Sequence, residues 1–123
     1  MQVSEINYEG PPPIDSYGGG GVRLNGEFHE GALIISPSMV VRWEISAAPL
    51  NADDFVALIA ESDNIDVLLV GMGEEIAPLP RAVHEAIECA GIGVEVMSTP
   101  SACRTYNILL AEDRRVAAAL ISL

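Results

Sequence analysis

Two strand-to-helix junctions, joined by one helix, constrain the fold of this chain more than any other feature. Residues 65–70, apolar except for Asp66, lack alternation, which is typical of a strand buried on both faces, and they lead into Gly71-Met72-Gly73. A helical pattern follows, and residues 92–97 read as the next strand. Because strands joined through a helix pair in parallel with a right-handed crossover, both junctions are expected at one edge of a parallel sheet. That edge is where α/β folds usually place a site.

The rest of the chain is predicted to supply strands, helices and an irregular N-terminal segment. Residues 1–21 hold a run of three prolines and a run of four glycines, which predicts an arm or loop. Asn25-Gly26 tolerates the positive φ angles of a two-residue turn and predicts a hairpin within 22–29. Hydrophobic spacing predicts strands at 31–35, 40–45 and 116–121 and helices at 52–61, 79–90 and 99–111, the last capped by Thr99 with Pro100 at its first position. We therefore expect one α/β domain over residues 22–123.

Composition excludes several classes of function. Of the 123 residues, 18 are acidic and 6 are basic, which gives a net charge of −12. A chain with this net negative charge repels phosphate backbones, and a nucleic-acid partner is therefore not expected. Every basic residue is an arginine, and the absence of lysine excludes Schiff-base chemistry and the phosphate-binding lysine of P-loop proteins. No apolar run approaches the roughly 20 residues that span a bilayer, and the N-terminus does not read as a signal peptide, so a cytoplasmic location is expected.

The two junctions predict one candidate ligand site. Their loops face each other, and the second loop opens a helix whose free N–H groups attract anions. Arg104, one turn into that helix, adds charge-assisted hydrogen bonds. The alternative is that the glycines form tight turns and the hydroxyls cap the helix, and Asn107 ties the helix to the loop at Gly71. The candidate crevice comprises Gly71, Gly73, Ser98, Thr99, Ser101, Arg104 and Asn107.

Cys103 is the one candidate nucleophile. It lies in the first turn of the same helix, where the dipole lowers the pKa of a thiol. Against this, Cys103, Tyr106 and Leu110 have the spacing of a face that points to the core, so a buried structural role is favoured. Cys89 flanks the apolar face of its own helix and is also expected to be structural. No metal-ligand spacing or dinucleotide fingerprint is present, so no metal and no cofactor are expected.

The C-terminal third holds the motifs Gly71-x-Gly73, Gly91-Ile92-Gly93-Val94-Glu95, Thr99-Pro100-x-Ala102-Cys103-x-Thr105-Tyr106-Asn107-x-Leu109 and Arg115-Val116-Ala117-Ala118-Ala119-Leu120-Ile121. With these motifs the chain resembles a known family. It is similar to the small domain of unknown function shared by bacterial and archaeal proteins and by the mitochondrial complex I assembly factor 3 proteins. The resemblance covers about residues 22–123 and implies a three-layer α/β domain with a mixed central sheet and an extra β-hairpin. It implies no established catalytic mechanism, and for the mitochondrial members it implies help in assembling a membrane respiratory complex with a partner protein.

Two hypotheses of function follow. The first, which we favour, is a non-enzymatic protein-interaction module that assists assembly of respiratory complex I or another membrane protein. The second is a small-molecule (anion) binding protein or enzyme that uses the crevice between Gly71–Gly73 and Ser98–Arg104. An enzyme needs a solvent-reached pocket with a base near Cys103, whereas an interaction module needs an exposed apolar patch. The oligomeric state is left open, with a homodimer slightly favoured by the apolar composition and the aromatic residues of segment 1–21.

Overall fold

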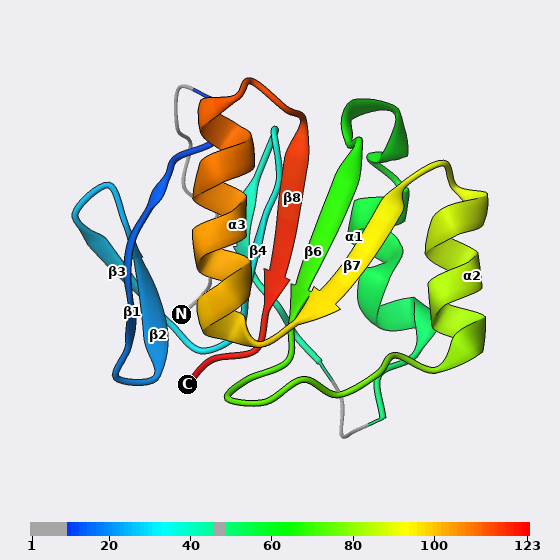
Figure 1. The fold of residues 1–123 in the computed structure, drawn as a ribbon, viewed down its shortest axis with the longest axis horizontal. Helices are drawn as coiled ribbons and strands as arrows, with labels where there is room; N and C mark the ends of the chain where they lie inside the picture. The colour runs from blue at the N-terminus through cyan, green and yellow to red at the C-terminus, as the bar shows by residue number, and fades with distance from the viewer. Residues whose placement is uncertain (1–9, 46–48) are drawn as a thin grey trace.

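A mixed five-stranded sheet forms the centre of the protein (Figure 1). The computed structural model describes residues 10–45 and 49–123, so Tyr8 and the rest of the expected arm at 1–9 lie outside the described residues. The central strand β6 pairs in parallel with β7 on one side and β8 on the other. β4 pairs antiparallel with both β8 and β5, which confirms the mixed sheet. The strands, in spatial order, are β5 (Val40–Arg42), β4 (Leu33–Ile35), β8 (Val116–Leu120), β6 (Val67–Gly71) and β7 (Gly93–Met97).

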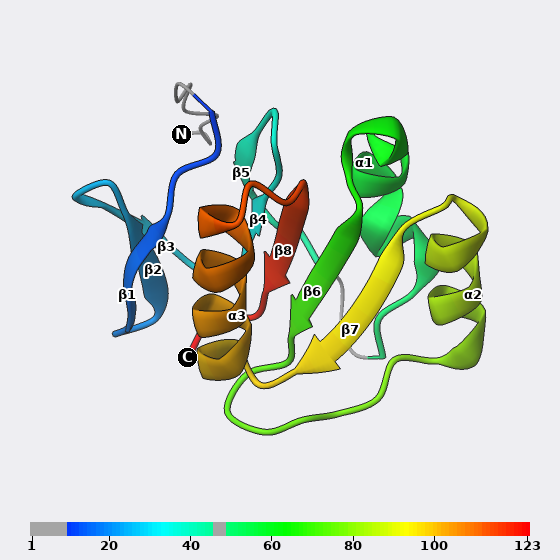
Figure 2. The ribbon, with the colours of Figure 1, turned by 45° about the horizontal axis from the view of Figure 1, so that its top comes forward.

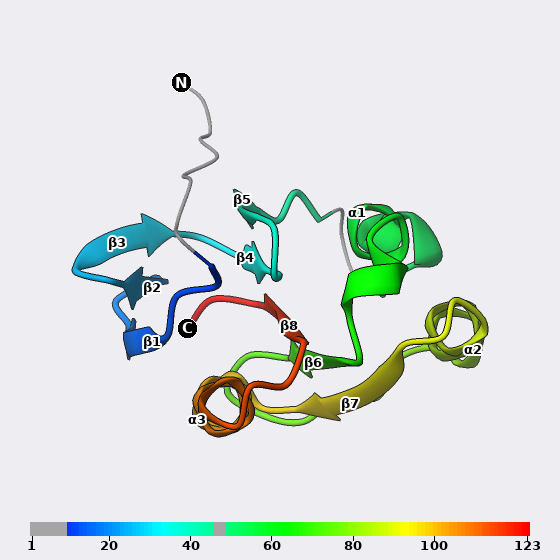
Figure 3. The ribbon, with the colours of Figure 1, turned by 90° about the horizontal axis from the view of Figure 1, so that it is seen from above.

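Helices cover the two faces of this sheet. The loop from β6 to α2 (Arg81–Cys89) runs along the carboxyl ends of the parallel strands (Figure 2). Seen from above, α3 (Thr99–Ala111) lies on one face, and α1 (Val56–Ile59) and α2 lie on the other (Figure 3). A separate small sheet of β1 (Ile14–Gly18), β2 (Gly21–Leu24) and β3 (Glu27–Glu30) stands beside α3. The three-layer α/β fold is therefore confirmed.

The core divides along the central sheet because successive side chains of a strand point to opposite faces. In β6, Val67 and Leu69 pack toward α3, whereas Leu68 and Val70 pack toward α1 and α2. All five residues of β6 are buried, as its lack of alternation predicts. β8 is equally buried, and its three alanines leave room for helices to approach on both faces.

The small sheet confirms one prediction and corrects another. Asn25 and Gly26 have φ angles of 49° and 82° and join β2 to β3, as expected of a two-residue hairpin turn. The expected loop character through residue 21 is wrong for Ile14–Gly18, which pairs antiparallel with β2. Glycines with positive φ angles form the tight turn between these two strands, so the glycine run connects regular structure.

The segment between β5 and β6 is less helical than predicted. Its start is confirmed, because the Asn51 side chain accepts a hydrogen bond from Asp53 N and Asp54 completes a capping box. Residues 52–61 then form two short pieces, a 3₁₀ turn at Ala52–Phe55 and the single turn α1. Trp43 is 4 % exposed, and its Nε1 donates to Asp54 O at 2.8 Å, so it packs in the core.

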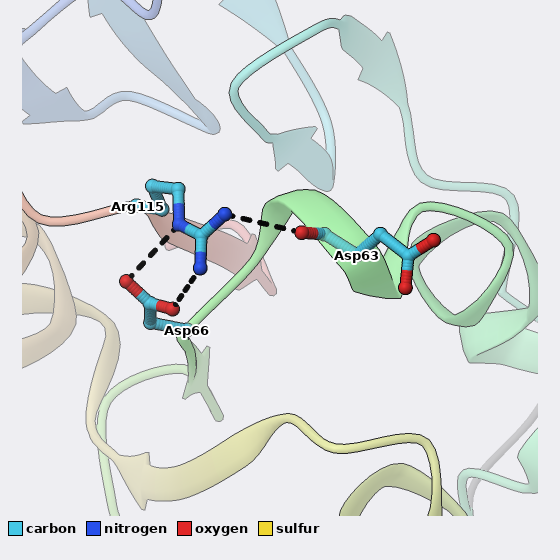
Figure 4. Close-up of polar contacts among 3 residues, drawn as sticks. All are labelled: Asp63, Asp66 and Arg115. Carbon is cyan, nitrogen blue, oxygen red and sulfur yellow. Dashed lines mark hydrogen bonds and ion pairs between the residues drawn. The ribbon is translucent and has the colours of Figure 1, made fainter.

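The amino ends of β6 and β8 are joined by an exposed ion pair (Figure 4). The guanidinium of Arg115 donates to both carboxylate oxygens of Asp66, with distances of 2.7 and 3.3 Å, and its Nη1 donates to Asp63 O at 3.2 Å. The backbone adds hydrogen bonds from Asp66 N to Arg115 O and from Gly93 N to Asp66 O. Three parallel strands are thereby held in register at this end of the sheet.

Candidate functional site

The two junctions lie side by side at the carboxyl ends of β6 and β7, as predicted. Met72 N donates to Met97 O at 2.9 Å, and Thr99 N donates to Gly73 O at 2.8 Å. The loops are therefore joined directly by backbone hydrogen bonds. We call the contact among Gly71, Gly73, Thr99 and Ile121 the carboxyl-end junction.

Thr99 fills the carboxyl-end junction. Its hydroxyl accepts a hydrogen bond from Gly73 N at 2.9 Å and donates one to Ile121 O at 2.7 Å, and the residue is 1 % exposed. A Cβ atom at Gly71 would lie 2.9 Å from both Cα and Oγ1 of Thr99, so only glycine fits this position without movement. The candidate crevice therefore has no open space between Gly71 and Thr99.

The start of α3 differs by one residue from the prediction. Ser98, rather than Thr99, is the N-cap, and its side chain accepts a hydrogen bond from Ser101 N at 3.3 Å. Thr99 is the first helical residue because its hydroxyl is already bonded to Gly73 N and Ile121 O. The Ser101 hydroxyl accepts from Arg104 Nη2 at 3.3 Å. Each hydroxyl of the candidate site therefore has a partner within the fold. Ser98 caps the helix, Thr99 binds across the carboxyl-end junction, and Ser101 accepts from Arg104.

Three of the predicted residues meet in a pocket on the other side of α3. This β1–α3 pocket has a volume of about 160 Å³ and is lined by Ile14, Asp15, Ser16, Tyr17, Cys103, Arg104 and Asn107. The Asn107 side chain joins α3 to β1 beside this pocket. Its Oδ1 accepts a hydrogen bond from Ile14 N and its Nδ2 donates one to Ile14 O, each at 2.8 Å. The predicted tie from Asn107 to the loop at Gly71 is therefore wrong, since the amide pairs with β1 as a neighbouring strand would.

Tyr106 binds the segment that precedes β1. Its ring is fully buried, and its hydroxyl donates to Pro12 O at 2.9 Å. Burial raises the pKa of this phenol well above its usual range, so the hydroxyl is a donor at every physiological pH. The Tyr-Asn pair of the motif therefore fixes the small sheet against α3.

Cys103 is not in an environment that activates a thiol. The side chain is 2 % exposed, and burial raises its pKa to about 11 although the Arg104 charge acts in the opposite direction. Desolvation therefore outweighs the Arg104 charge, and the thiol is not the activated nucleophile that its place in the first turn suggested. Cys89, expected to be structural, is exposed instead.

A second pocket lies at the same edge of the sheet and escaped sequence reasoning. We call it the proline pocket; its volume is about 240 Å³, and each lining side chain that the structure describes is apolar. Three segments form it: Ile121 directly after β8, Ile45 with Pro49 and Leu50, and the loop from Met72 to Pro80. The available signal was the alternation of Ala77-Pro78-Leu79-Pro80 behind Glu74-Glu75. The lining residues are Ile45, Pro49, Leu50, Met72, Ala77, Pro78, Leu79, Pro80 and Ile121.

The remaining candidate chemistry is sparse. Glu74 and Glu75 are exposed. On the surface of α2, His84 Nδ1 lies 3.4 Å from Glu88 Oε1. Within 10–45 and 49–123, no cluster of three or more His, Cys, Asp or Glu side chains is arranged to hold a metal ion. None of the helices over these same ranges has the length and apolar character needed to cross a bilayer.

Comparisons with known proteins place this geometry in a family. An uncharacterised protein of Rhodobacter capsulatus is 42 % identical over 121 residues, which cover 98 % of this chain and 93 % of the relative. The human NADH dehydrogenase (ubiquinone) 1 alpha subcomplex assembly factor 3 is 37 % identical over 109 residues, which are 88 % of this chain. The chain spans 59 % of the length of that human protein.

Solved structures share the fold. A crystal structure of a protein described as an outer membrane protein from Bartonella henselae is 40 % identical, with a TM-score of 0.87, and the match covers 92 % of this chain and 96 % of that one. A Bordetella parapertussis protein is 32 % identical, with a TM-score of 0.82 and coverage of 93 % and 98 %. The family described as "protein of unknown function (DUF498/DUF598)" matches residues 14–121. This chain therefore belongs to the DUF498/DUF598 family, whose relatives include proteins named complex I assembly factor 3.

Proposed function

We propose that this chain is a non-enzymatic, cytoplasmic protein-interaction module that assists assembly of respiratory complex I or a related membrane complex. The observation that carries the proposal is the similarity of 88 % of the chain to proteins named as complex I assembly factors. An assembly factor acts by binding other proteins, so protein partners are expected.

The chemistry of the site supports a role in binding. The motif residues Thr99, Tyr106 and Asn107 use their polar atoms within the fold. The thiol of Cys103 is buried and protonated at neutral pH. The proline pocket, in contrast, is apolar and open, which suits an interaction surface better than a reaction.

Deletion of the gene in the organism that encodes it tests this proposal. We expect membranes of the deletion strain to contain less assembled complex I on a native gel and to oxidise NADH more slowly, and a plasmid copy to restore both. Unchanged complex and unchanged NADH oxidation would contradict the respiratory role.

A second candidate function is anion binding at Arg104. It is favoured by the position of Arg104 and Asn107 in the β1–α3 pocket, where an exposed guanidinium faces a cavity of about 160 Å³. Titration with inorganic phosphate and with acetate, followed by NMR, tests it. Saturable shifts at Arg104 that Arg104→Gln removes and Arg81→Gln retains would support this candidate, and shifts equal in both variants would contradict it.

A further inference from the structure

The shape of the proline pocket limits what can fill it. Its volume of about 240 Å³ lies below the roughly 300–1,000 Å³ typical of pockets for drug-sized ligands and cofactors. Leu50 and Leu79 form buried walls, and Met72 and Ile121 are half-buried. A cavity of this size accommodates a large apolar side chain.

The described lining offers no polar side chain to recognise a metabolite. Over residues 10–45 and 49–123, every side chain around the pocket is apolar, and Pro49, Pro78 and Pro80 have no backbone N–H to donate. Proline also fixes φ, so the walls lose little conformational freedom when the pocket is filled. The part of an occupant that enters the pocket must therefore be hydrocarbon or aromatic.

Two acidic residues lie in the loop that lines the pocket. Glu74 and Glu75 lie in the loop between the lining residues Met72 and Ala77, and both are exposed. Ile76 beside them is 69 % exposed and extends the apolar surface. The nearby cation Arg81 is paired with Glu85 at 3.1 Å. This acidic loop therefore attracts cationic groups and repels anions such as fatty acids and a second copy of this chain, whose net charge is −12.

We propose that the proline pocket receives a large apolar side chain of a partner protein, in a segment where lysine or arginine flanks that side chain. The inference rests on the proposed function and specifies the chemistry of its partner. The apolar anchor fills the cavity and supplies most of the affinity, and the cationic neighbours lie over Glu74 and Glu75 and orient the segment.

NMR titration of the isotopically labelled chain with three synthetic peptides tests the proposal. The first is acetyl-Gly-Arg-Phe-Arg-Gly-amide, the second has glutamate in place of both arginines, and the third has alanine in place of phenylalanine. We expect the first to shift the methyl signals of Met72, Leu79 and Ile121 and to bind at least about tenfold more tightly than either of the others.

Two protein variants carry matched controls. Ala77→Trp fills the pocket from its exposed edge and is expected to abolish binding, whereas Ala111→Trp, on the exposed end of α3, is expected to leave it unchanged. The double variant Glu74→Gln/Glu75→Gln is expected to weaken binding roughly fivefold. The variant Glu112→Gln/Asp113→Asn removes the same charge at the far end of α3 and is expected to have no effect. If Ala77→Trp does not fold, the peptide series still decides the matter.

Three results would overturn the proposal. The first is peptide shifts that map to the β1–α3 pocket, or no shifts at millimolar peptide. The second is octanoate binding more tightly than the arginine peptide and indifferent to Glu74 and Glu75, which would mark an apolar small-molecule site. The third is a dimer in sedimentation whose interface contains Met72 and Leu79. Peptide binding combined with an unaffected deletion strain would retain this inference and remove only the respiratory function.

Discussion

The carboxyl-end junction and the proline pocket begin at the same turn after β6, yet one is sealed and the other is open. In the junction, Gly71 allows Thr99 to approach, and the Thr99 hydroxyl satisfies Gly73 N and Ile121 O. In the pocket, prolines and hydrocarbon side chains surround a cavity of about 240 Å³. A recognisable motif can therefore mark the part of a sheet edge that is closed, and the binding surface can lie in the less distinctive loop beside it.

The motif residues along α3 also bind other parts of the fold. Thr99 at its start seals the junction, and Tyr106 and Asn107 in its middle bind Pro12 and Ile14. The motif therefore joins the central sheet and the small sheet through one helix. On this account its residues stabilise the fold, and their substitution acts on stability before it acts on binding.

The largest expected effect comes from Gly71→Ala. The added Cβ would lie 2.9 Å from the backbone of Thr99 and 3.0 Å from Leu120 Cδ2, so the junction must open. We expect a loss of about 3 kcal/mol in the free energy of unfolding, measured by urea denaturation. Gly93→Ala is the matched control, because its Cβ would meet Asp66 O at 3.5 Å, an ordinary contact. Equal effects of the two substitutions would contradict a sealed junction.

Thr99→Val tests the hydrogen bonds of the junction without changing its volume much. The substitution leaves Gly73 N and Ile121 O without their partner, and buried unpaired groups are costly. We expect a loss of about 2 kcal/mol in the free energy of unfolding, with Thr99→Ser losing less because it retains the hydroxyl. If valine and serine at this position were equally stable, the hydroxyl would have no sealing role.

Asn107→Ala tests the attachment of the small sheet. It removes both hydrogen bonds to Ile14, and we expect a loss of about 1.5 kcal/mol in the free energy of unfolding. Amide exchange is expected to rise in β1 and to remain slow in β6. Asn107→Asp retains the acceptor and loses the donor, so its effect should be intermediate. An equal rise in amide exchange in both sheets would contradict a local role for the Asn107–Ile14 hydrogen bonds.

The smallest expected effect lies at the opposite end of the sheet, in the exposed Asp66–Arg115 pair. The hydrogen bond from Arg115 lowers the pKa of Asp66 below the usual 3.8. A carboxyl whose native pKa is lowered stabilises the fold above pH 3.8, and that contribution is lost as the pH falls through the native pKa. Asp66→Asn should therefore reduce the acid dependence of the melting temperature only slightly. Asp63→Asn is the control, since Asp63 binds Arg115 through its backbone oxygen.

The sequence predicted the elements whose local pattern agrees with their tertiary setting. The unbroken apolar run of β6 could be interpreted as a doubly buried strand, and Asn25-Gly26 as a hairpin turn, because each feature depends on its own residues. β1 was missed since glycine and proline surround it and its pairing depends on β2 and on the side chain of Asn107, 93 residues away. Propensity carries no information about such a distant partner.

The site was harder to predict for the same reason. Ser98 and Thr99 are equally good caps, and the choice between them depends on Gly73 N and Ile121 O, which already bind the Thr99 hydroxyl. Whether the Cys103 thiol is activated depends on its burial, which raises its pKa and is set by residues distant in the sequence. The proline pocket combines three distant segments of apolar residues, and a pattern of that kind has no spacing rule.

One measurement tests the division between a sealing motif and an open pocket most directly. The arginine-flanked phenylalanine peptide is titrated by calorimetry into Thr99→Val and Ala77→Trp, each confirmed to be folded at the working temperature. The account predicts that Thr99→Val, although less stable, binds within about twofold of the parent chain, and that Ala77→Trp binds at least about tenfold more weakly. Loss of binding in folded Thr99→Val, with binding retained in Ala77→Trp, would contradict it.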